Sequence, residues 1–70
     1  MPIQRAYIAL ISWIDGDVED ADELRVFAES AESAKTLARE IWLRTKAPLW
    51  PTCRITSVEA FPPTRLSSLA

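Results

Sequence analysis

The chain has 70 residues, of which 49% are hydrophobic and 26% are charged, with a formal net charge of −2. This length allows one domain with a small core, and the composition is typical of a folded protein rather than a disordered one. Histidine is absent and the single cysteine is Cys53, which removes the commonest general base and excludes an internal disulfide and a zinc cluster. We therefore expect a protein that is not an enzyme and that holds no cofactor and no metal.

The first half of the chain predicts two strands. Residues 3–14 are rich in Ile, Tyr and Trp, and nothing in them breaks a strand. The Asp-Gly dipeptide that follows predicts a turn, because Gly16 can adopt a positive φ. Acidic residues continue to Glu23, so we expect a loop of several residues before a second strand over 24–29. Alternation along the first strand predicts one face with Ala6, Ile8 and Leu10 and another with Arg5, Tyr7, Ala9, Ile11 and Trp13.

After Ser30 the spacing of the apolar residues changes to that of a helix. Ser30 is a suitable N-cap, and Glu32 lies in the first turn, where a negative charge favours the helix dipole. Pro48 ends the helix. The predicted buried stripe consists of Ala31, Ala34, Leu37, Ala38, Ile41, Trp42 and Thr45.

A third strand is predicted over residues 53–60. Its apolar residues Ile55 and Val58 differ in parity, so either both faces of the strand are used or a bulge shifts the phase. The prolines that follow end the regular structure. We expect residues 62–70 to form a flexible C-terminal tail outside the domain.

The order of these elements predicts one α+β domain of the ββαβ type over residues 1–61. Because a right-handed return through the helix places the third strand beside the first, we expect a three-stranded antiparallel sheet of order 2-1-3. One helix packs on one face of this sheet and leaves the other face uncovered. The uncovered face is expected to expose Tyr7, Ile11, Trp13 and Phe27 among Arg5 and Arg25.

Six of the ten acidic residues lie in one nine-residue stretch: Asp15, Asp17, Glu19, Asp20, Asp22 and Glu23. The alternate carboxylates are similar to the start of a calcium loop, but such a loop needs a bidentate Glu at its twelfth position, where this chain has Val26. Two interpretations remain open. The stretch is a solvated loop that keeps a small protein soluble, or it presents carboxylates to a basic partner in place of phosphates.

The expected aromatic and arginine face also has several interpretations. It could stack nucleobases, although the acidic stretch disfavours direct binding of nucleic acid. It could form a homodimer or bind another protein, since aromatic residues and arginine are enriched in interface cores. Alternatively, Trp50 and the C-terminal proline segment cover it. Cys53 is expected to be a small, buried or half-buried strand residue, because no histidine is present to activate it.

Three segments of the sequence resemble a known group of proteins: Ala6-Tyr7-Ile8, the strand end and helix opening over residues 28–38, and Arg54-Ile55-Thr56-Ser57-Val58. They are similar to small phage-encoded ββαβ proteins that include type I anti-CRISPR inhibitors. The resemblance implies a non-catalytic protein that binds a Cas subunit of a type I CRISPR surveillance complex and blocks its binding to target DNA. It further implies a location in the cytoplasm of the bacterial host, which agrees with the lack of a signal-peptide pattern.

Under this hypothesis the acidic stretch contacts basic side chains that normally hold phosphates, by mimicry of DNA. The expected contact residues are Asp15, Asp17, Glu19, Asp20, Asp22 and Glu23, with Tyr7, Trp13 and Phe27 as apolar anchors. The alternative is a small domain that binds single-stranded nucleic acid, or that forms a homodimer, through the aromatic sheet face. A membrane partner is not expected.

Overall fold

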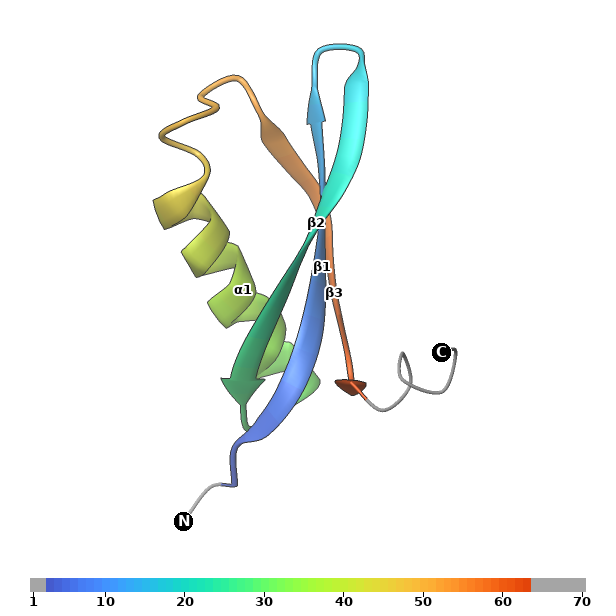
Figure 1. Cartoon of the computed structure of the whole chain (residues 1–70), viewed down its shortest axis with the longest axis vertical. Helices are drawn as coiled ribbons and strands as arrows, with labels where there is room; N and C mark the ends of the chain where they lie inside the picture. Colours follow the sequence, from blue (N-terminus) through green and yellow to red (C-terminus); the bar gives the residue numbers. More distant parts are fainter. Residues whose placement is uncertain (1–2, 64–70) are drawn as a thin grey trace.

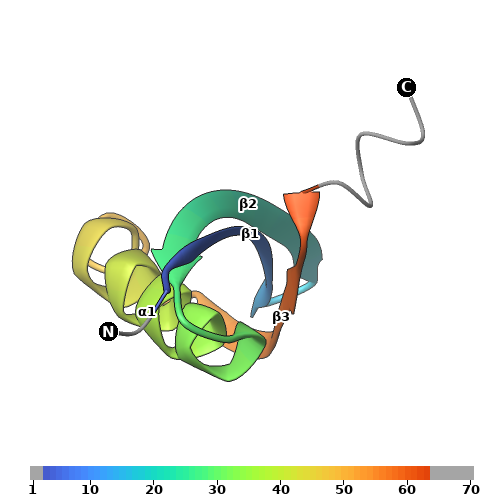
Figure 2. The ribbon, with the colours of Figure 1, turned by 90° about the horizontal axis from the view of Figure 1, so that it is seen from below.

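Three antiparallel strands and one helix form the part of the chain that the computed structural model describes, residues 3–63 (Figure 1). The elements are β1 (Arg5–Asp15), β2 (Val18–Ala28), α1 (Ala31–Thr45) and β3 (Arg54–Phe61). The strands form one sheet of order β2-β1-β3, and α1 lies on one side of it (Figure 2). The predicted α+β fold and strand order are confirmed. Residues 64–70 of the predicted C-terminal tail lie outside the described residues.

β1 and β2 form one long hairpin. They pair over 11 residues each, from Arg5 opposite Ala28 to Asp15 opposite Val18. A two-residue turn joins them, and its first residue, Gly16, has a φ of 62°. The prediction of a loop up to Glu23 is therefore wrong. The tight turn returns the chain at once, so the acidic residues pair their backbone with β1 while one edge of β2 stays open to water.

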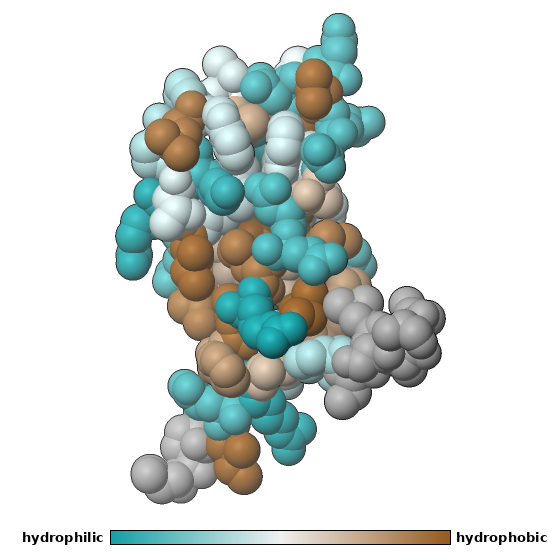
Figure 3. Space-filling view, viewed as in Figure 1, coloured by the Kyte–Doolittle hydropathy of each residue, from teal (hydrophilic) through white to brown (hydrophobic). Residues whose placement is uncertain are grey.

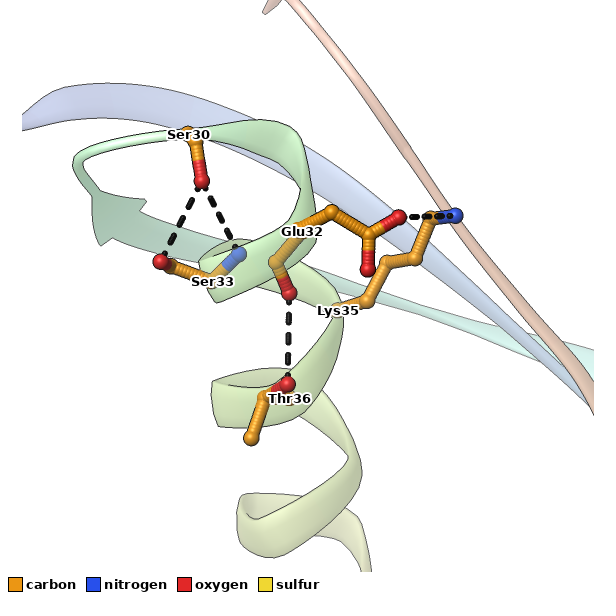
Figure 4. A network of polar contacts seen from close by, with 5 residues as sticks. All are labelled: Ser30, Glu32, Ser33, Lys35 and Thr36. Atoms are coloured by element: carbon orange, nitrogen blue, oxygen red, sulfur yellow. Dashed lines mark hydrogen bonds and ion pairs between the residues drawn. The ribbon is translucent and has the colours of Figure 1, made fainter.

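The start of α1 is held by a network of short polar contacts (Figure 4). The Ser30 hydroxyl accepts a hydrogen bond from the Ser33 backbone N–H at 3.2 Å, which confirms the predicted N-cap. The Thr36 hydroxyl donates to the Glu32 carbonyl, and the Lys35 ammonium lies 3.4 Å from the Glu32 carboxylate. These contacts satisfy backbone groups at the helix start and place a negative charge where the helix dipole favours it.

The core lies between α1 and the sheet. Three alanines in it, Ala9, Ala34 and Ala38, are fully buried, and their small side chains allow the helix backbone to lie close to the strands. Trp42 provides the largest buried side chain and is only 1% exposed. The other buried members of this core are Tyr7, Ile11, Val26 and Ala28.

The helix covers the face of β1 that was expected to be exposed. Tyr7 is 9% exposed and Ile11 is fully buried, so the prediction that they lie on the uncovered face is wrong. β1 is apolar on both faces, and its own alternation does not choose between them. The neighbouring strand does, because β2 turns Val26 and Ala28 toward the helix and the charged Arg25 away from it.

β3 contains a bulge, as one of the two alternatives for its mixed parity predicts. Ser12 of β1 pairs with Ser57, whereas the next residue of β1 pairs with Ile55, so Thr56 is an extra residue. The shift turns both Ile55 and Val58 toward the core, where they are partly buried. The strand begins one residue later than predicted and ends at Phe61.

The turn gives the first testable prediction. Replacement of Gly16→Ala should lower the free energy of unfolding by about 1–2 kcal/mol, because a residue with a Cβ is strained at positive φ. No neighbouring atom lies within 4 Å of the added Cβ, so the cost comes from the backbone conformation alone. Urea unfolding followed by circular dichroism measures it, with Asp17→Ala as the control at a negative φ. Equal stability of wild type and Gly16→Ala would contradict this account.

Candidate functional site

The most polar feature of the molecule is the tip of the hairpin, residues 15–23, which we call the acidic hairpin. It extends past the last turn of α1, at the top of Figure 1, and its surface is largely hydrophilic (Figure 3). The hairpin contains six carboxylates here and no basic residue between Arg5 and Arg25. Because strand pairing holds the backbone on both sides of the two-residue turn, these charges are displayed on an ordered support.

Two of the six carboxylates are used within the fold. Asp15 accepts a hydrogen bond from the Thr52 hydroxyl at 2.7 Å. Asp22 accepts one from the buried indole N–H of Trp42 at 2.9 Å. Both side chains lie on the helix-covered face of the sheet, and both are half-buried. They stabilise the tertiary structure, and of the predicted contact residues they are the least available to a partner.

The other four carboxylates are exposed to water. Asp17 lies in the turn, and Asp20 lies on β2 with one oxygen accepting from the backbone N–H of the next residue at 2.8 Å. Glu19 and Glu23 lie on the opposite face of β2, across from Ile14 and Leu10. The predicted acidic surface therefore reduces to four carboxylates, distributed over the turn and both faces of one strand.

The sheet face away from α1, which we call the open face, carries apolar side chains from all three strands. Ile8 at its centre is 7% exposed although α1 packs on the other face of the sheet, and its neighbours on the flanking strands are Arg25 and Phe61. Phe27 is 59% exposed. Of the three predicted aromatic anchors, only Phe27 lies on this face. Two carboxylates also lie on this face, since Glu23 and Glu59 flank Leu10 on either side.

Tyr7 and Trp13 lie on the helix-covered face. The Trp13 ring stacks on Trp50 with 6.1 Å between the ring centroids and 27° between their planes. The Lys46 ammonium lies 5.3 Å from the centroid of Trp50, within the range of a cation–π contact. Trp50 therefore covers Trp13, as one interpretation expected, but it does so on the helix side of the sheet. The two aromatic residues hold the segment after α1 against the hairpin.

Cys53 is half-buried, and its backbone N–H donates to the Trp50 carbonyl at 3.0 Å. Loss of solvation raises the pKa of its thiol, and the negative charge of Asp15, a hydrogen bond to Asp15 and the charge of Asp22 raise it further. Every one of these effects disfavours the thiolate, which is the reactive form. Cys53 is therefore a poor nucleophile.

A shallow groove of about 280 Å³ lies between α1 and β3. Lys35 and Arg39 line its helix side, and Ile55 and Val58 line its strand side. The sequence pattern does not predict this groove, because it forms between elements that meet only in the folded chain. The one sequence feature that points to this groove is the basic pair Lys35 and Arg39, four residues apart on α1.

Within residues 3–63, no group of three or more histidine, cysteine, aspartate or glutamate side chains is placed to hold a metal ion. The helix described there is too short and too polar to cross a membrane. Comparison of the chain with protein-family models, with curated proteins and with solved structures gives no match. The candidate contact surfaces are therefore the acidic hairpin, the open face and the groove.

The bond between Asp22 and Trp42 gives the second prediction. Asp22→Ala should lower the free energy of unfolding by about 1–3 kcal/mol, because it leaves the buried indole N–H without an acceptor. Asp22→Asn should cost less, since its amide oxygen can still accept the bond. Denaturant unfolding measures both variants, with Asp20→Ala on the same strand as the control. A cost for Asp22→Ala no larger than that of the control would contradict a structural role for this carboxylate.

The third prediction concerns the pH dependence of Cys53. Alkylation of its thiol by iodoacetamide should reach half of its maximal rate at a higher pH than in the unfolded chain, because the folded structure raises the pKa. Asp15→Asn removes a negative charge that opposes the thiolate, so it should lower this pKa and speed alkylation at pH 8. Asp17→Asn in the turn should leave the profile unchanged. Alkylation of the folded protein as fast as that of the unfolded chain would contradict the prediction.

Proposed function

We propose that the chain is a non-catalytic protein inhibitor that binds a Cas subunit of a type I CRISPR surveillance complex and blocks its binding to target DNA. The observation that carries this proposal is the acidic hairpin, with four exposed carboxylates on a rigid arm that has no basic residue. The class of target comes from the resemblance of the sequence to small phage-encoded anti-CRISPR proteins.

The carboxylates act in place of DNA phosphates. A subunit that holds nucleic acid presents Arg and Lys side chains, and these form charge-assisted hydrogen bonds with carboxylates as they do with phosphates. The contact residues in this proposal are Asp17, Glu19, Asp20 and Glu23. Phe27 on the same strand supplies an exposed apolar anchor. Since the hairpin backbone is already ordered, binding costs little conformational entropy.

In this proposal four of the expected contact residues stabilise the fold and do not touch the partner: Asp15, Asp22, Tyr7 and Trp13. Asp15 and Asp22 bind other parts of the chain, and Tyr7 and Trp13 pack on the helix side of the sheet. Their substitution is therefore expected to act through stability rather than through direct contact with the partner.

A second candidate function is binding of single-stranded nucleic acid on the open face. Its support is the exposure of Phe27, 59%, beside Arg25 on the same strand. Glu23 and Glu59 oppose it, because carboxylates on that face repel phosphates. The inhibitor proposal predicts no affinity for free oligonucleotides, so one binding measurement separates the two functions.

The fourth prediction tests the acidic hairpin in a gel-shift assay. Purified type I surveillance complexes of several subtypes are incubated with target DNA, with and without a small excess of the protein. Loss of the shifted band is expected for at least one subtype, and the effect should weaken as salt rises. Asp17→Lys combined with Asp20→Lys should abolish the effect with little change in melting temperature, since both residues are exposed.

Glu29→Lys combined with Glu40→Lys is the matched control, because it makes the same change in net charge at exposed sites outside the hairpin. This control should inhibit as wild type does. Unchanged shifts with every subtype would refute the inhibitor proposal. Inhibition that survives the Asp17 and Asp20 substitutions would refute the acidic hairpin as the contact. Direct binding of an oligonucleotide, lost in Phe27→Ala, would favour the second candidate.

A further inference from the structure

The outer edge of β3 is open to pairing with another strand. β3 is the last strand in the order β2-β1-β3, and within residues 3–63 its outer backbone groups have no strand partner. Such an edge is a template on which a further strand can pair. The groove beside it leaves Ile55 and Val58 only partly covered by α1. A partner strand on this edge would cover more of both apolar side chains.

The sequence of β3 is complementary to itself. In an antiparallel pair of two copies centred on the midpoint of residues 54–59, Arg54 of each copy lies opposite Glu59 of the other. Ile55 lies opposite Val58 in the same register. Both charged side chains are exposed, and neither takes part in the one ion pair found among the described residues, Lys35 with Glu32. They are free to pair with a second copy.

The faces of the sheet agree with this register. Arg54 pairs with Ile14 and Glu59 pairs with Leu10, so both charged side chains lie on the open face. Because they share a face, Arg54 of one copy can contact Glu59 of the other when the two lie opposite each other. The apolar residues lie on the helix-covered face, Ile55 beside Trp13 and Val58 beside Ile11. The centre of this register lies between Thr56, the bulge residue, and Ser57. The segments on either side of it therefore stay regular.

The other edge and the other registers are less suitable. An antiparallel pair of two β2 edges would bring together two strands that each carry Glu19, Asp20, Asp22 and Glu23, and like charges repel. A β3 pair that uses only the residues after the bulge would set Glu59 against its own copy. The register around the midpoint of 54–59 is the one that joins opposite charges and matches the faces.

We infer that two copies of the chain associate through antiparallel pairing of their β3 strands. The product is a symmetric six-stranded sheet of order β2-β1-β3-β3-β1-β2, in which each interface residue contacts its complement in the other copy. The two acidic hairpins then lie at the outer strands, far from the twofold axis. This association does not rest on the proposed function, and the charge-reversal variant Asp17→Lys with Asp20→Lys should retain it.

The fifth prediction concerns charge-reversal variants of β3, whose dimerisation is measured by sedimentation equilibrium of the full chain. Because one strand pair buries a small interface, wild type should pass from monomer to dimer between about 10 μM and about 1 mM. Arg54→Glu and Glu59→Arg should each raise the dimer dissociation constant by about tenfold, because each sets like charges opposite one another twice. An equimolar mixture of the two variants should associate as wild type does, since every pair in the mixed dimer is again opposite in charge.

Two helix variants, Arg44→Glu and Glu40→Arg, are the matched controls. They make the same charge changes at exposed positions on α1 and should leave the dissociation constant unchanged. The double variant Arg54→Glu with Glu59→Arg restores the complement within one chain and should dimerise, which keeps the test valid if a single variant fails to fold. Circular dichroism checks folding of each variant.

Three results would overturn the inference. Wild type could remain monomeric over the whole concentration range. The mixture of single variants could associate no better than either variant alone. Finally, dimerisation could be unaffected by Arg54→Glu and lost in Phe27→Ala, which would assign the interface to the open face instead.

Discussion

The contact on which the structure depends is the packing of α1 on the sheet around Trp42. This side chain is almost fully buried, and its indole N–H donates to Asp22 on β2. The bond ties the helix to the middle of the hairpin, while Ala34 and Ala38 allow close approach. Together these contacts determine which face of the sheet is buried. They also determine which carboxylates of the acidic hairpin remain free, since Asp22 is used inside the molecule.

The acidic hairpin is an example of a charged sequence that forms a regular strand. Glu, Asp and Ala have low strand propensity, yet β2 continues from Val18 through this stretch to Ala28. The two-residue turn at Gly16 places each acidic residue opposite a residue of β1, and the apolar first strand supplies the partner backbone. The outer side of β2 remains in water, where charge is tolerated and opposes pairing with other strands. The same property makes this arm suitable for contact with a basic surface.

The two edges of the sheet therefore differ in chemistry. β2 is acidic, which disfavours contact with a second copy. β3 carries one residue of each charge, Arg54 before the bulge at Thr56 and Glu59 after it. In the proposed dimer β3 is buried at the centre and β2 forms both outer edges, so each edge would have a separate role.

The sequence alone determined the order of elements, the N-cap at Ser30, the turn at Gly16 and the stripe of α1 that faces the sheet from Ala31 to Trp42, because these depend on neighbours within a few residues. Thr45, the last residue of the predicted stripe, is exposed. The strand order followed from the handedness of the connection. Only the tertiary structure decided which face of β1 is covered, because that strand is apolar on both faces. The choice depends on the neighbouring strand β2, whose Val26 and Ala28 face the helix. The tertiary structure likewise decided which acidic residues form hydrogen bonds within the fold. Asp15 and Asp22 bind partners 37 and 20 positions away in the chain, and contacts at that separation leave no periodic signal in the sequence.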